Sequence, residues 1–365
     1  MTATHYFAIF FTEHLYYIPQ FLPVARELDK RNLNYIFVVL ESSKRDIFNQ
    51  NDSIVRVCEK ENIPYKVGES GFENSTCDYL ICGGDNYPET SLPHDKKVLI
   101  VHGIGTKVSA FTEDKNRFDI RFIEGEFRLK RLQELYPNAK TVWENVGFSK
   151  LDDVFRYTTK MKDELLEKLG LDKNKPTLLY APTFYPSSIE NMSNKFPEEF
   201  SNFNLIIKPH YYSYLRKKYK AQRKKFKKWE KYKNVYFAGF EDYNIAPFYA
   251  VSDLLISDES SVIFEFAALD KPVICNRFIH LRLSYRLFGR YKFNKRMESA
   301  MNRFRDIGEN VWKYKNLKST VESELKSPEH NHSKRMEYTK EIIGPVDGKV
   351  SVRMVDLLER ELKNK

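Results

Sequence analysis

The sequence predicts an α/β protein with two doubly wound parallel-sheet domains, because short apolar runs alternate with helical patterns along almost the whole chain. Its 365 residues suffice for two domains of ordinary size, and a hydrophobic content of 42% can supply a core for each. Parallel strands joined by right-handed crossovers bind ligands at their carboxyl ends. We therefore expect two halves with a ligand-binding cleft between them.

Apolar runs of the first half predict its strands: residues 6–11, 35–40, 79–82, 98–101, 121–123 and 142–146. Between the first two runs, apolar side chains recur at helical spacing from Ile18 to Leu28, which predicts the first crossover helix. Further runs predict the strands of the second half: residues 177–181, 205–208, 235–237, 254–257 and 273–275. Turn-forming residues cluster from Gly170 to Pro176, so we expect one domain over 1–170, another over 171–345 and a final helix over 346–365.

The chain carries 60 Lys and Arg against 50 Asp and Glu, and its net charge of +10 favours an acidic partner. Nucleic acid, an anionic lipid, or a phosphorylated substrate or polymer would each fit. No run approaches the ~18 apolar residues that span a bilayer. The apolar run at 6–11 lacks a basic leader and a cleavage site, so it predicts a strand and not a signal peptide, and we expect an intracellular or peripheral protein.

The cysteines are scattered along the sequence: Cys58, Cys77, Cys82 and Cys275. Cys77 and Cys82 lack the spacing of a metal site. We expect reduced, mostly buried thiols, with no disulfide, no metal ion and no cofactor.

The stretch 253–275 is the most informative part of the chain. It predicts a buried strand, a polar turn, a helix that begins at Ser260 and Ser261, and a second strand. Unpaired amides and the positive end of the helix dipole would meet there, which favours a phosphate. Glu265 lies one helical turn further on, where it suits a ribose hydroxyl. Ser260 as a plain cap of a core helix is an equally good interpretation.

Three more polar groups follow predicted strands. His102 projects from a glycine-containing turn after 98–101, with Lys107 in the same loop, and its imidazole is suited to accept a proton from a hydroxyl. Thr183 follows 177–181, where its hydroxyl could touch a phosphate or base, or simply belong to a turn. Lys208 and His210 end the next strand and could together neutralise a diphosphate without metal. A turn-capping or core role remains the alternative for His102.

A basic segment interrupts this pattern from 216 to 233, where eleven of eighteen residues are Lys or Arg. Aromatic side chains, Trp229 among them, are interleaved with the charges. We expect contact with an anionic membrane or polymer through the following residues: Lys224, Lys225, Lys227, Lys228 and Trp229. A solvated surface helix is the alternative. A second basic stretch, from Arg277 to Arg305, supports the first interpretation.

Taken together and in this order, the motifs resemble the CDP-glycerol glycerophosphotransferase family, whose members make the poly(alditol phosphate) chains of teichoic acids and related capsules. The segments that carry the resemblance are His102-Gly103 with Lys107, Gly147-Phe-Ser-Lys150-Leu-Asp152, Tyr180-Ala-Pro-Thr183, Lys208-Pro-His210, Asp258-Glu-Ser260-Ser261 with Glu265, and Asp347-Gly348. The similarity runs from about residue 98 to 358. Lys150 stands where the family usually has Arg, and Pro precedes His210 instead of following it.

The resemblance implies a GT-B architecture of two Rossmann-like domains and transfer of glycerol phosphate or ribitol phosphate from a CDP-activated donor. His102 would be the base that deprotonates an acceptor hydroxyl for attack at the β-phosphorus, with CMP as the leaving group. His210, Lys208, Thr183, Ser260 and Ser261 would bind the donor and stabilise its departing CMP, and Glu265 would hold the ribose. Acceptor or phosphate binding would fall to Lys107, Lys150 and Asp152.

The implied acceptor is an anionic polymer or lipid-linked molecule, and the implied location is the cytoplasm, peripheral to the inner face of the cell membrane. Two other functions stay open. A glycosyltransferase of the same architecture would use a nucleotide sugar for surface polysaccharide synthesis, and a non-catalytic protein would use the basic segment to bind polyanions. We expect no nucleic acid partner, because no known nucleic-acid motif is present.

Overall fold

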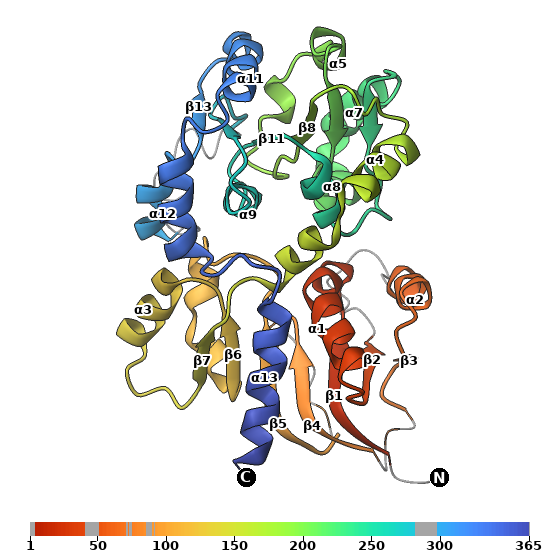
Figure 1. Ribbon diagram of the computed structural model, residues 1–365, viewed down its shortest axis with the longest axis vertical. Helices are drawn as coiled ribbons and strands as arrows, with labels where there is room; N and C mark the ends of the chain where they lie inside the picture. The colour runs from red at the N-terminus through yellow and green to blue at the C-terminus, as the bar shows by residue number, and fades with distance from the viewer. Residues whose placement is uncertain are drawn as a thin grey trace. The chain divides into compact units, whose positions relative to one another are not determined.

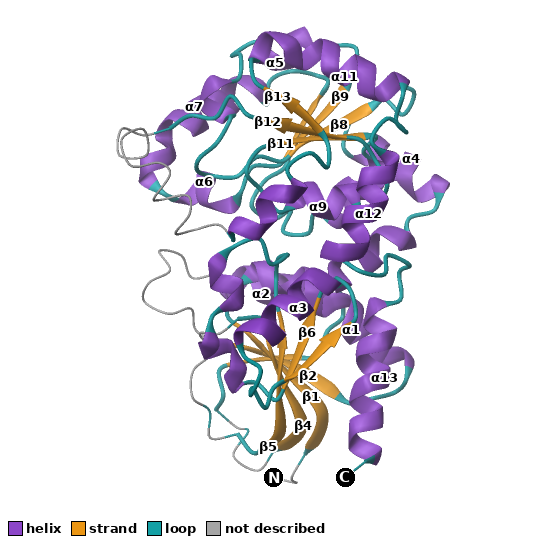
Figure 2. Cartoon of the chain, turned by 90° about the vertical axis from the view of Figure 1, so that its left-hand side faces the viewer, coloured by secondary structure: helices purple, strands orange, loops and turns teal. Residues whose placement is uncertain are grey.

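The structure is a computed structural model that describes residues 4–40, 51–70, 72, 75–84, 90, 92–281 and 298–364. Its contacts divide the chain into two compact α/β units, each with a parallel sheet of its own (Figure 1). Unit 1 comprises Met1–Gly105, Phe111–Asp153 and Ile342–Lys365. Unit 2 comprises Thr106–Ala110 and Val154–Glu341. Helices surround each sheet (Figure 2), which is the layering expected for parallel strands.

The sheet of unit 1 has seven strands in the order β3-β2-β1-β4-β5-β6-β7. Their bounds are β1 His5–Thr12, β2 Tyr35–Val39, β3 Tyr65–Val67, β4 Thr76–Cys82, β5 His94–Ile100, β6 Ile120–Ile123 and β7 Val142–Asn145. The helices of this unit are α1 Ile18–Lys30, α2 Asn51–Lys60, α3 Glu126–Leu135 and α13 Val350–Lys363. A buried cluster that includes Ile9, Leu80 and Leu99 forms part of its core.

The helices α1 and α2 end in the same way. Asn32 and Asn62 follow them in the left-handed conformation, each with φ of 55°, which Asn tolerates better than most residues. Leu33 and Ile63 then donate their amides back to the last helical turn. These ends turn the chain toward β2 and β3.

The sheet of unit 2 has six strands in the order β10-β9-β8-β11-β12-β13. Their bounds are β8 Thr177–Tyr180, β9 Asn204–Ile207, β10 Val235–Phe237, β11 Leu254–Ser257, β12 Val273–Asn276 and β13 Glu309–Val311. The helices are α4 Thr159–Lys168, α5 Phe196–Glu199, α6 Tyr211–Leu215, α7 Lys220–Trp229, α8 Ala246–Val251, α9 Val262–Ala267, α11 Leu317–Lys326 and α12 His332–Ile342. Ile256 of β11 pairs with Tyr180 on one side and Ile274 on the other, so the carboxyl ends of β8, β11 and β12 lie together.

Every strand expected from the sequence is present, and β3 and β13 are additional. Both are three-residue strands with partly exposed side chains, so neither gives an apolar run. The division between the units falls at Asp153 and Val154, earlier than the expected boundary at 170, because α4 packs against α8 of unit 2. The final helix, α13, packs on α1 of unit 1 (Figure 1).

All four cysteines are buried, as expected. Among the described residues, none of the helices combines the length and the apolar character needed to cross a bilayer.

Candidate functional site

Asp258 organises the strand ends of unit 2. It follows β11 directly and is fully buried. One carboxylate oxygen accepts a hydrogen bond from the backbone amide of Thr183 at 2.7 Å. The other accepts the amide of Ser188 at 2.8 Å and the hydroxyls of Ser187 and Ser188 at 3.1 Å each. The predicted Thr183 loop is therefore fastened to β11 through a single carboxylate.

Burial sets the protonation of this group. Desolvation raises the pKa of Asp258 to about 7, although the hydrogen bonds from Ser188, Thr183 and Ser187 favour the ionised form. A carboxyl group that changes charge near neutral pH thus lies at the end of the central strand β11.

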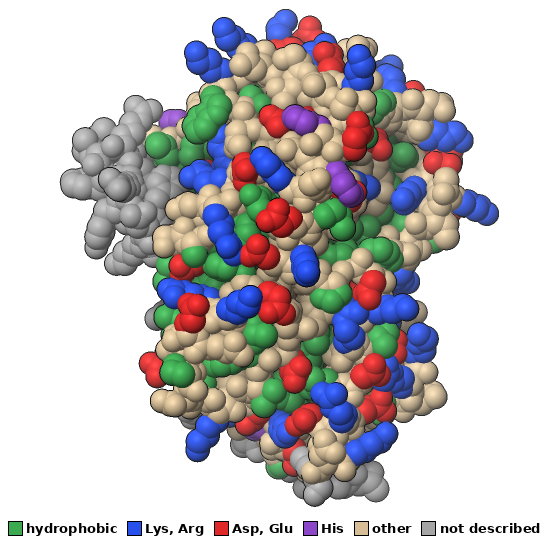
Figure 3. Space-filling model, turned by 60° about the vertical axis from the view of Figure 1, so that its left-hand side comes forward, with side chains coloured by type: hydrophobic (Ala, Val, Ile, Leu, Met, Phe, Trp, Pro, Cys, Tyr) green, Lys and Arg blue, Asp and Glu red, His purple; other side chains and the backbone are tan. Residues whose placement is uncertain are grey.

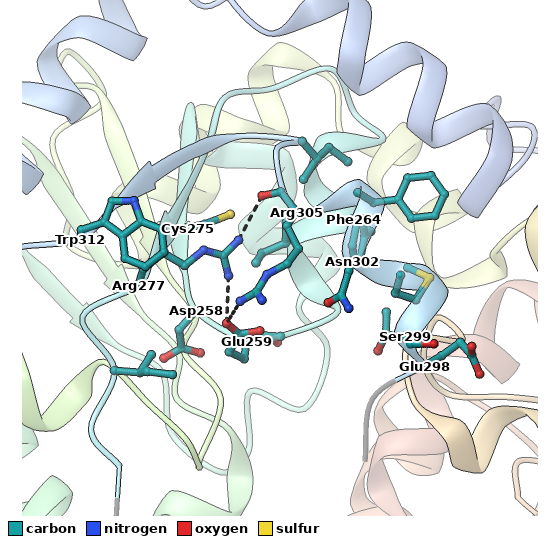
Figure 4. A pocket seen from close by; sticks show the side chains of 17 residues that line it. Asp258, Glu259, Phe264, Cys275, Arg277, Glu298, Ser299, Asn302, Arg305 and Trp312 are labelled. Atoms are coloured by element: carbon teal, nitrogen blue, oxygen red, sulfur yellow. Dashed lines mark hydrogen bonds and ion pairs between the residues drawn. The ribbon is translucent and has the colours of Figure 1, made fainter. Parts of the chain in front are cut away.

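A cavity of about 380 Å³ opens beside this carboxylate, entirely within unit 2 (Figure 4). Its walls come from the turn between β11 and α9, the end of β12, and the segment from 298 to 312. Thr106 of the first-half loop also lines it, and Glu298 donates its backbone amide to the Thr106 carbonyl. Of the donor residues predicted from sequence, Ser260 lines this cavity.

Two arginines meet one glutamate in the cavity wall (Figure 4). Nη1 of Arg277 and Nη2 of Arg305 lie 3.0 and 2.7 Å from the same oxygen, Oε1 of Glu259. Arg277 also donates to the carbonyl of Arg305 at 3.1 Å. Arg277 is 6% exposed and Arg305 is 53% exposed, so one guanidinium is fixed and the other faces solvent. Guanidinium groups bind phosphate through paired hydrogen bonds.

Sequence reasoning missed this arrangement. Arg277 lies two residues after the predicted strand 273–275, which is a signal for a strand-end site, but the sequence analysis places it in the second basic stretch. The approach of Arg305 to Glu259 depends on tertiary structure that no local pattern shows. Trp312, another lining residue that the prediction missed, leaves 69% of its surface exposed.

The other predicted donor residues lie outside the cavity lining. Lys208 and His210 follow β9, which pairs with β8. The His210 ring packs 4.7 Å from that of Phe184, and its Nδ1 accepts the Tyr212 amide at 3.2 Å as the cap of α6. Ser261 is the N-cap residue of α9, but its side chain makes no cap hydrogen bond.

Glu265 lies inside unit 2. Its side chain is 1% exposed, and its carboxylate accepts the Tyr249 hydroxyl at 3.0 Å. Glu265 lies on the inner face of α9 and is not among the residues that line this cavity, and its ribose contact stays a prediction.

In unit 1, His102 lies after β5 among aromatic side chains. The residue is exposed, and its ring centroid lies 4.5 Å from Tyr16 and 5.7 Å from Tyr17. The His102 carbonyl accepts the side-chain amide of Gln20 at 2.6 Å. His14 stacks on Tyr16 with ring centroids 4.8 Å apart. Helix α1 therefore holds the backbone of His102 through Gln20, and rings from the segment between β1 and α1 pack against the exposed imidazole.

Two glycines after β4 make room for one of these rings. A Cβ atom at Gly83 would lie 2.3 Å from Cγ of Tyr17, and one at Gly84 would lie 2.2 Å from its hydroxyl oxygen. Any side chain there would displace Tyr17. A Gly-Gly pair directly after a predicted strand was a signal that could have marked this edge of the sheet.

The far end of the His102 loop is anchored as well. The Gly105 amide donates to Glu124 at 2.7 Å, and Arg128 donates to both oxygens of that carboxylate at 2.6 Å. Beyond Gly105 the chain passes into unit 2, where Lys107 is exposed. The two predicted residues of this loop thus belong to different compact units.

Asp152 has a structural role at the start of α13, and its predicted contact with acceptor or phosphate stays a prediction. It is 6% exposed, and its oxygens accept the amides of Val350 and Ser351 at 3.1 and 2.7 Å and the hydroxyl of Ser351 at 2.7 Å. It caps α13, whose first amides need acceptors. Lys150 is buried too, with its ammonium group 5.1 Å from the centre of the Phe148 ring.

Residues 220–229 of the basic segment form an amphipathic helix, α7, and two of the predicted contact residues point inward. Trp229 is fully buried in the core of unit 2, and its indole nitrogen donates to the Ser193 carbonyl. Lys225 donates to the carbonyls of Ile189, Glu190 and Met192, and desolvation lowers its pKa. We therefore no longer expect Trp229 and Lys225 to contact a membrane or an anionic polymer.

Lys224, Lys227 and Lys228 are exposed, so the basic face of α7 is narrower than predicted. The face drawn in Figure 3 differs from this row of lysines, because its Lys and Arg side chains are interspersed with Asp and Glu.

Two α/β units, each with its own parallel sheet, are the architecture expected of a GT-B protein. The model of the CDP-glycerol:poly(glycerophosphate) glycerophosphotransferase family matches residues 95–360, and the chain belongs to this family. It is 27% identical over 182 residues to the teichoic acid poly(glycerol phosphate) polymerase of Bacillus spizizenii, covering 45% of this chain and 42% of that protein. It is 34% identical over 130 residues to the teichoic acid glycerol-phosphate primase of the same organism, covering 34% and 31%.

These alignments span less than half the length of each relative. The structure of the wall teichoic acid polymerase TagF is similar over 98% of this chain and 89% of its own, with a TM-score of 0.66 at 16% identity. That likeness confirms the predicted fold.

Proposed function

We propose that this protein transfers an alditol phosphate, either glycerol phosphate or ribitol phosphate, from a CDP-activated donor to a hydroxyl of a surface polymer or glycolipid. Membership of the family over residues 95–360 is the observation that carries the proposal. Its relatives are named as a polymerase and a primase of glycerol phosphate in teichoic acid synthesis. An anionic polymer or a lipid-linked molecule is the acceptor class that fits.

In the proposed reaction the acceptor oxygen attacks the β-phosphorus of the donor. A phosphodiester bond forms, the bond from the β-phosphorus to the bridging oxygen breaks, and CMP leaves with that oxygen. The proton of the acceptor hydroxyl passes to His102, whose exposed position lets a hydroxyl reach the imidazole. His102 is accordingly proposed as the general base.

The cavity of unit 2 is the proposed donor site. Ser260 lines it, and a donor diphosphate would compete with Glu259 for the guanidinium groups of Arg277 and Arg305. The exposed indole of Trp312 offers a flat surface on which a base can stack. The other expected donor contacts lie outside the lining of this cavity but follow neighbouring strands of the same sheet, and we still propose them for parts of the donor beyond the cavity: Lys208, Thr183, Ser261 and His210.

The assay combines the purified protein with CDP-glycerol or CDP-ribitol and a glycolipid acceptor, and measures CMP by chromatography. We expect CMP release that depends on both donor and acceptor. Parallel reactions with UDP-GlcNAc provide the contrast. Release of UDP from the sugar nucleotide, with no CMP from either CDP-alditol, would assign the protein to glycosyl transfer instead.

The exposed lysines of α7 support a location at the inner face of the cell membrane. Lys224, Lys227 and Lys228 lie on the solvent side of a helix whose other face is packed into unit 2. Each basic side chain near an anionic surface contributes about 1 kcal/mol. We propose peripheral contact with anionic lipid through this face.

A further inference from the structure

Three side chains from separate segments of unit 2 converge at the edge of its sheet. Glu309 begins the edge strand β13, Glu324 lies in α11, and His330 lies in the turn before α12. One potential ligand atom from each lies within 4.8 Å of the other two. Nδ1 of His330 is 2.9 Å from Oε1 of Glu324 and 3.8 Å from Oε1 of Glu309.

Glu324 occupies a position where an apolar residue would be expected. The buried face of α11 consists of Leu317, Val321 and Glu324, at helical spacing of i, i+4 and i+7, and α11 packs on β11 and β13. The sequence therefore places a carboxylate on the core side of an amphipathic helix. Such a group is unfavourable unless it is paired or coordinates a metal ion.

The pairing of this carboxylate is incomplete. Glu324 is 2% exposed, and its Oε1 accepts a hydrogen bond from His330. Its Oε2 is buried and has no hydrogen-bond partner among the described residues. A protonated His330 would donate a hydrogen bond to Oε1 of Glu324 and leave Oε2 without a partner. A divalent cation would neutralise the whole carboxylate.

We propose that Glu309, Glu324 and His330 bind a divalent transition-metal ion of the zinc class, with water completing the coordination. One imidazole and two carboxylates form a ligand set that zinc accepts, whereas magnesium and calcium prefer oxygen ligands alone. Ligand atoms around a tetrahedral zinc ion are about 3.3 Å apart. The pair at 2.9 Å is close to this separation, and Oε1 of Glu309 lies 3.8 Å from Nδ1 of His330.

The surroundings support such a site. Asn331 donates to Glu309 at 3.1 Å, which orients that carboxylate in the manner of an outer-shell partner. The His330 side chain is 57% exposed, so an ion can enter from solvent. The bound ion would fasten β13 to α11 and to the start of α12. It would also steady the donor cavity, because Asn310, next to Glu309, accepts a hydrogen bond from Arg277 at 2.5 Å.

The test uses the untagged full chain, freed of metal by chelation and dialysis. Isothermal titration with Zn²⁺ should show one saturable site, and excess Zn²⁺ should raise the melting temperature by roughly 5 °C. The variants Glu309→Gln and His330→Gln should each lose about tenfold or more in affinity. His332→Gln is the matched control, because His332 is a neighbouring exposed histidine that pairs with Asp270.

Metal-free Glu324→Gln separates the two interpretations of the cluster. If the carboxylate is balanced by an ion, the neutral variant without metal should melt at or above the temperature of metal-free wild type and should not respond to Zn²⁺. A variant that melts lower than wild type in both conditions would indicate a plain ion pair with His330. The proposal also fails if wild type shows no saturable binding, or if the Glu309 and His330 variants bind Zn²⁺ as tightly as the control.

Discussion

The strand ends of the two units share an architecture but present opposite kinds of side chain. In unit 1 an exposed histidine, His102, lies against aromatic rings and is held through its backbone carbonyl. In unit 2 a buried carboxylate, Asp258, takes four hydrogen bonds and shapes the wall of a cavity. The strand ends of unit 1 leave the imidazole of His102 accessible. Those of unit 2 use the Asp258 carboxylate to fix the backbone of the Thr183 loop. Substitutions at the first should therefore change rate, and substitutions at the second should change stability.

The largest expected effect is on rate in unit 1. His102→Ala should lower turnover by about 10²–10⁴-fold if His102 is the general base, with little change in melting temperature because the side chain is exposed. CMP release at saturating donor measures this. His5→Ala, an exposed histidine at the start of β1, serves as control. Near-normal turnover in the His102 variant would exclude it from the chemistry.

The matching change in unit 2 is Asp258→Asn. An amide nitrogen would replace an acceptor in a site filled by donors, which should lower the free energy of unfolding by about 2–4 kcal/mol. Urea denaturation at pH 5, where the wild type retains the contribution of this group, measures the loss. Variants that remove one donor, Ser187→Ala or Ser188→Ala, should lose less. A variant as stable as wild type would show that Asp258 does not hold the Thr183 loop in place.

Asp258 should also make stability depend on pH. Its pKa is raised from 3.8 to about 7, so the folded protein holds this proton more tightly than the unfolded chain does. The stabilising contribution is fully present below pH 3.8 and is lost as the pH rises through about 7. Each pKa unit corresponds to about 1.4 kcal/mol, so wild type should lose a few kcal/mol between pH 5 and 8. Asp258→Asn should remove this component, and an unchanged pH profile would contradict the assignment.

A smaller loss of stability is expected from substitutions at Gly83 and Gly84, which make room for the Tyr17 ring. Gly83→Ala would place a methyl group 2.3 Å from Tyr17, and such overpacking costs about 1–3 kcal/mol. It should also lower turnover, because Tyr17 packs beside His102. Gly239→Ala is the control, since a Cβ there would meet its nearest atom at 4.0 Å. Equal behaviour of the two variants would mean that Tyr17 relocates without consequence.

The smallest effect per residue concerns the basic face of α7. Changing Lys224, Lys227 and Lys228 to Gln should weaken co-sedimentation with anionic vesicles by about 1 kcal/mol per lysine, and the wild-type interaction should fade as salt rises. Lys160, Lys168 and Lys173 are exposed lysines of the same unit and provide a control with the same change in charge. If both triple variants bind like wild type, α7 is a solvated face.

The sequence was sufficient wherever the information was local. Each predicted strand is present, because a buried parallel strand is a run of apolar residues. The buried face of α7 also has a local signal, since Gln222, Phe226 and Trp229 recur at helical spacing and are buried. The density of lysines alone predicts a charged surface and gives no sign of this buried face. Asp152 and Glu265 could not be placed in this way, because their partners, Ser351 and Tyr249, are brought to them by packing.

The return of the last helix to unit 1 has a consequence for how the protein is made. α13 covers α1, and its Leu358 carbonyl accepts a hydrogen bond from Tyr79 of β4. On the ribosome, the strands of unit 2 all emerge before this helix does. Domains generally fold as units during synthesis. We therefore expect the sheet of unit 2 to form before α13 can pack on α1. Unit 1 would then finish folding after unit 2, although most of its residues are synthesised first.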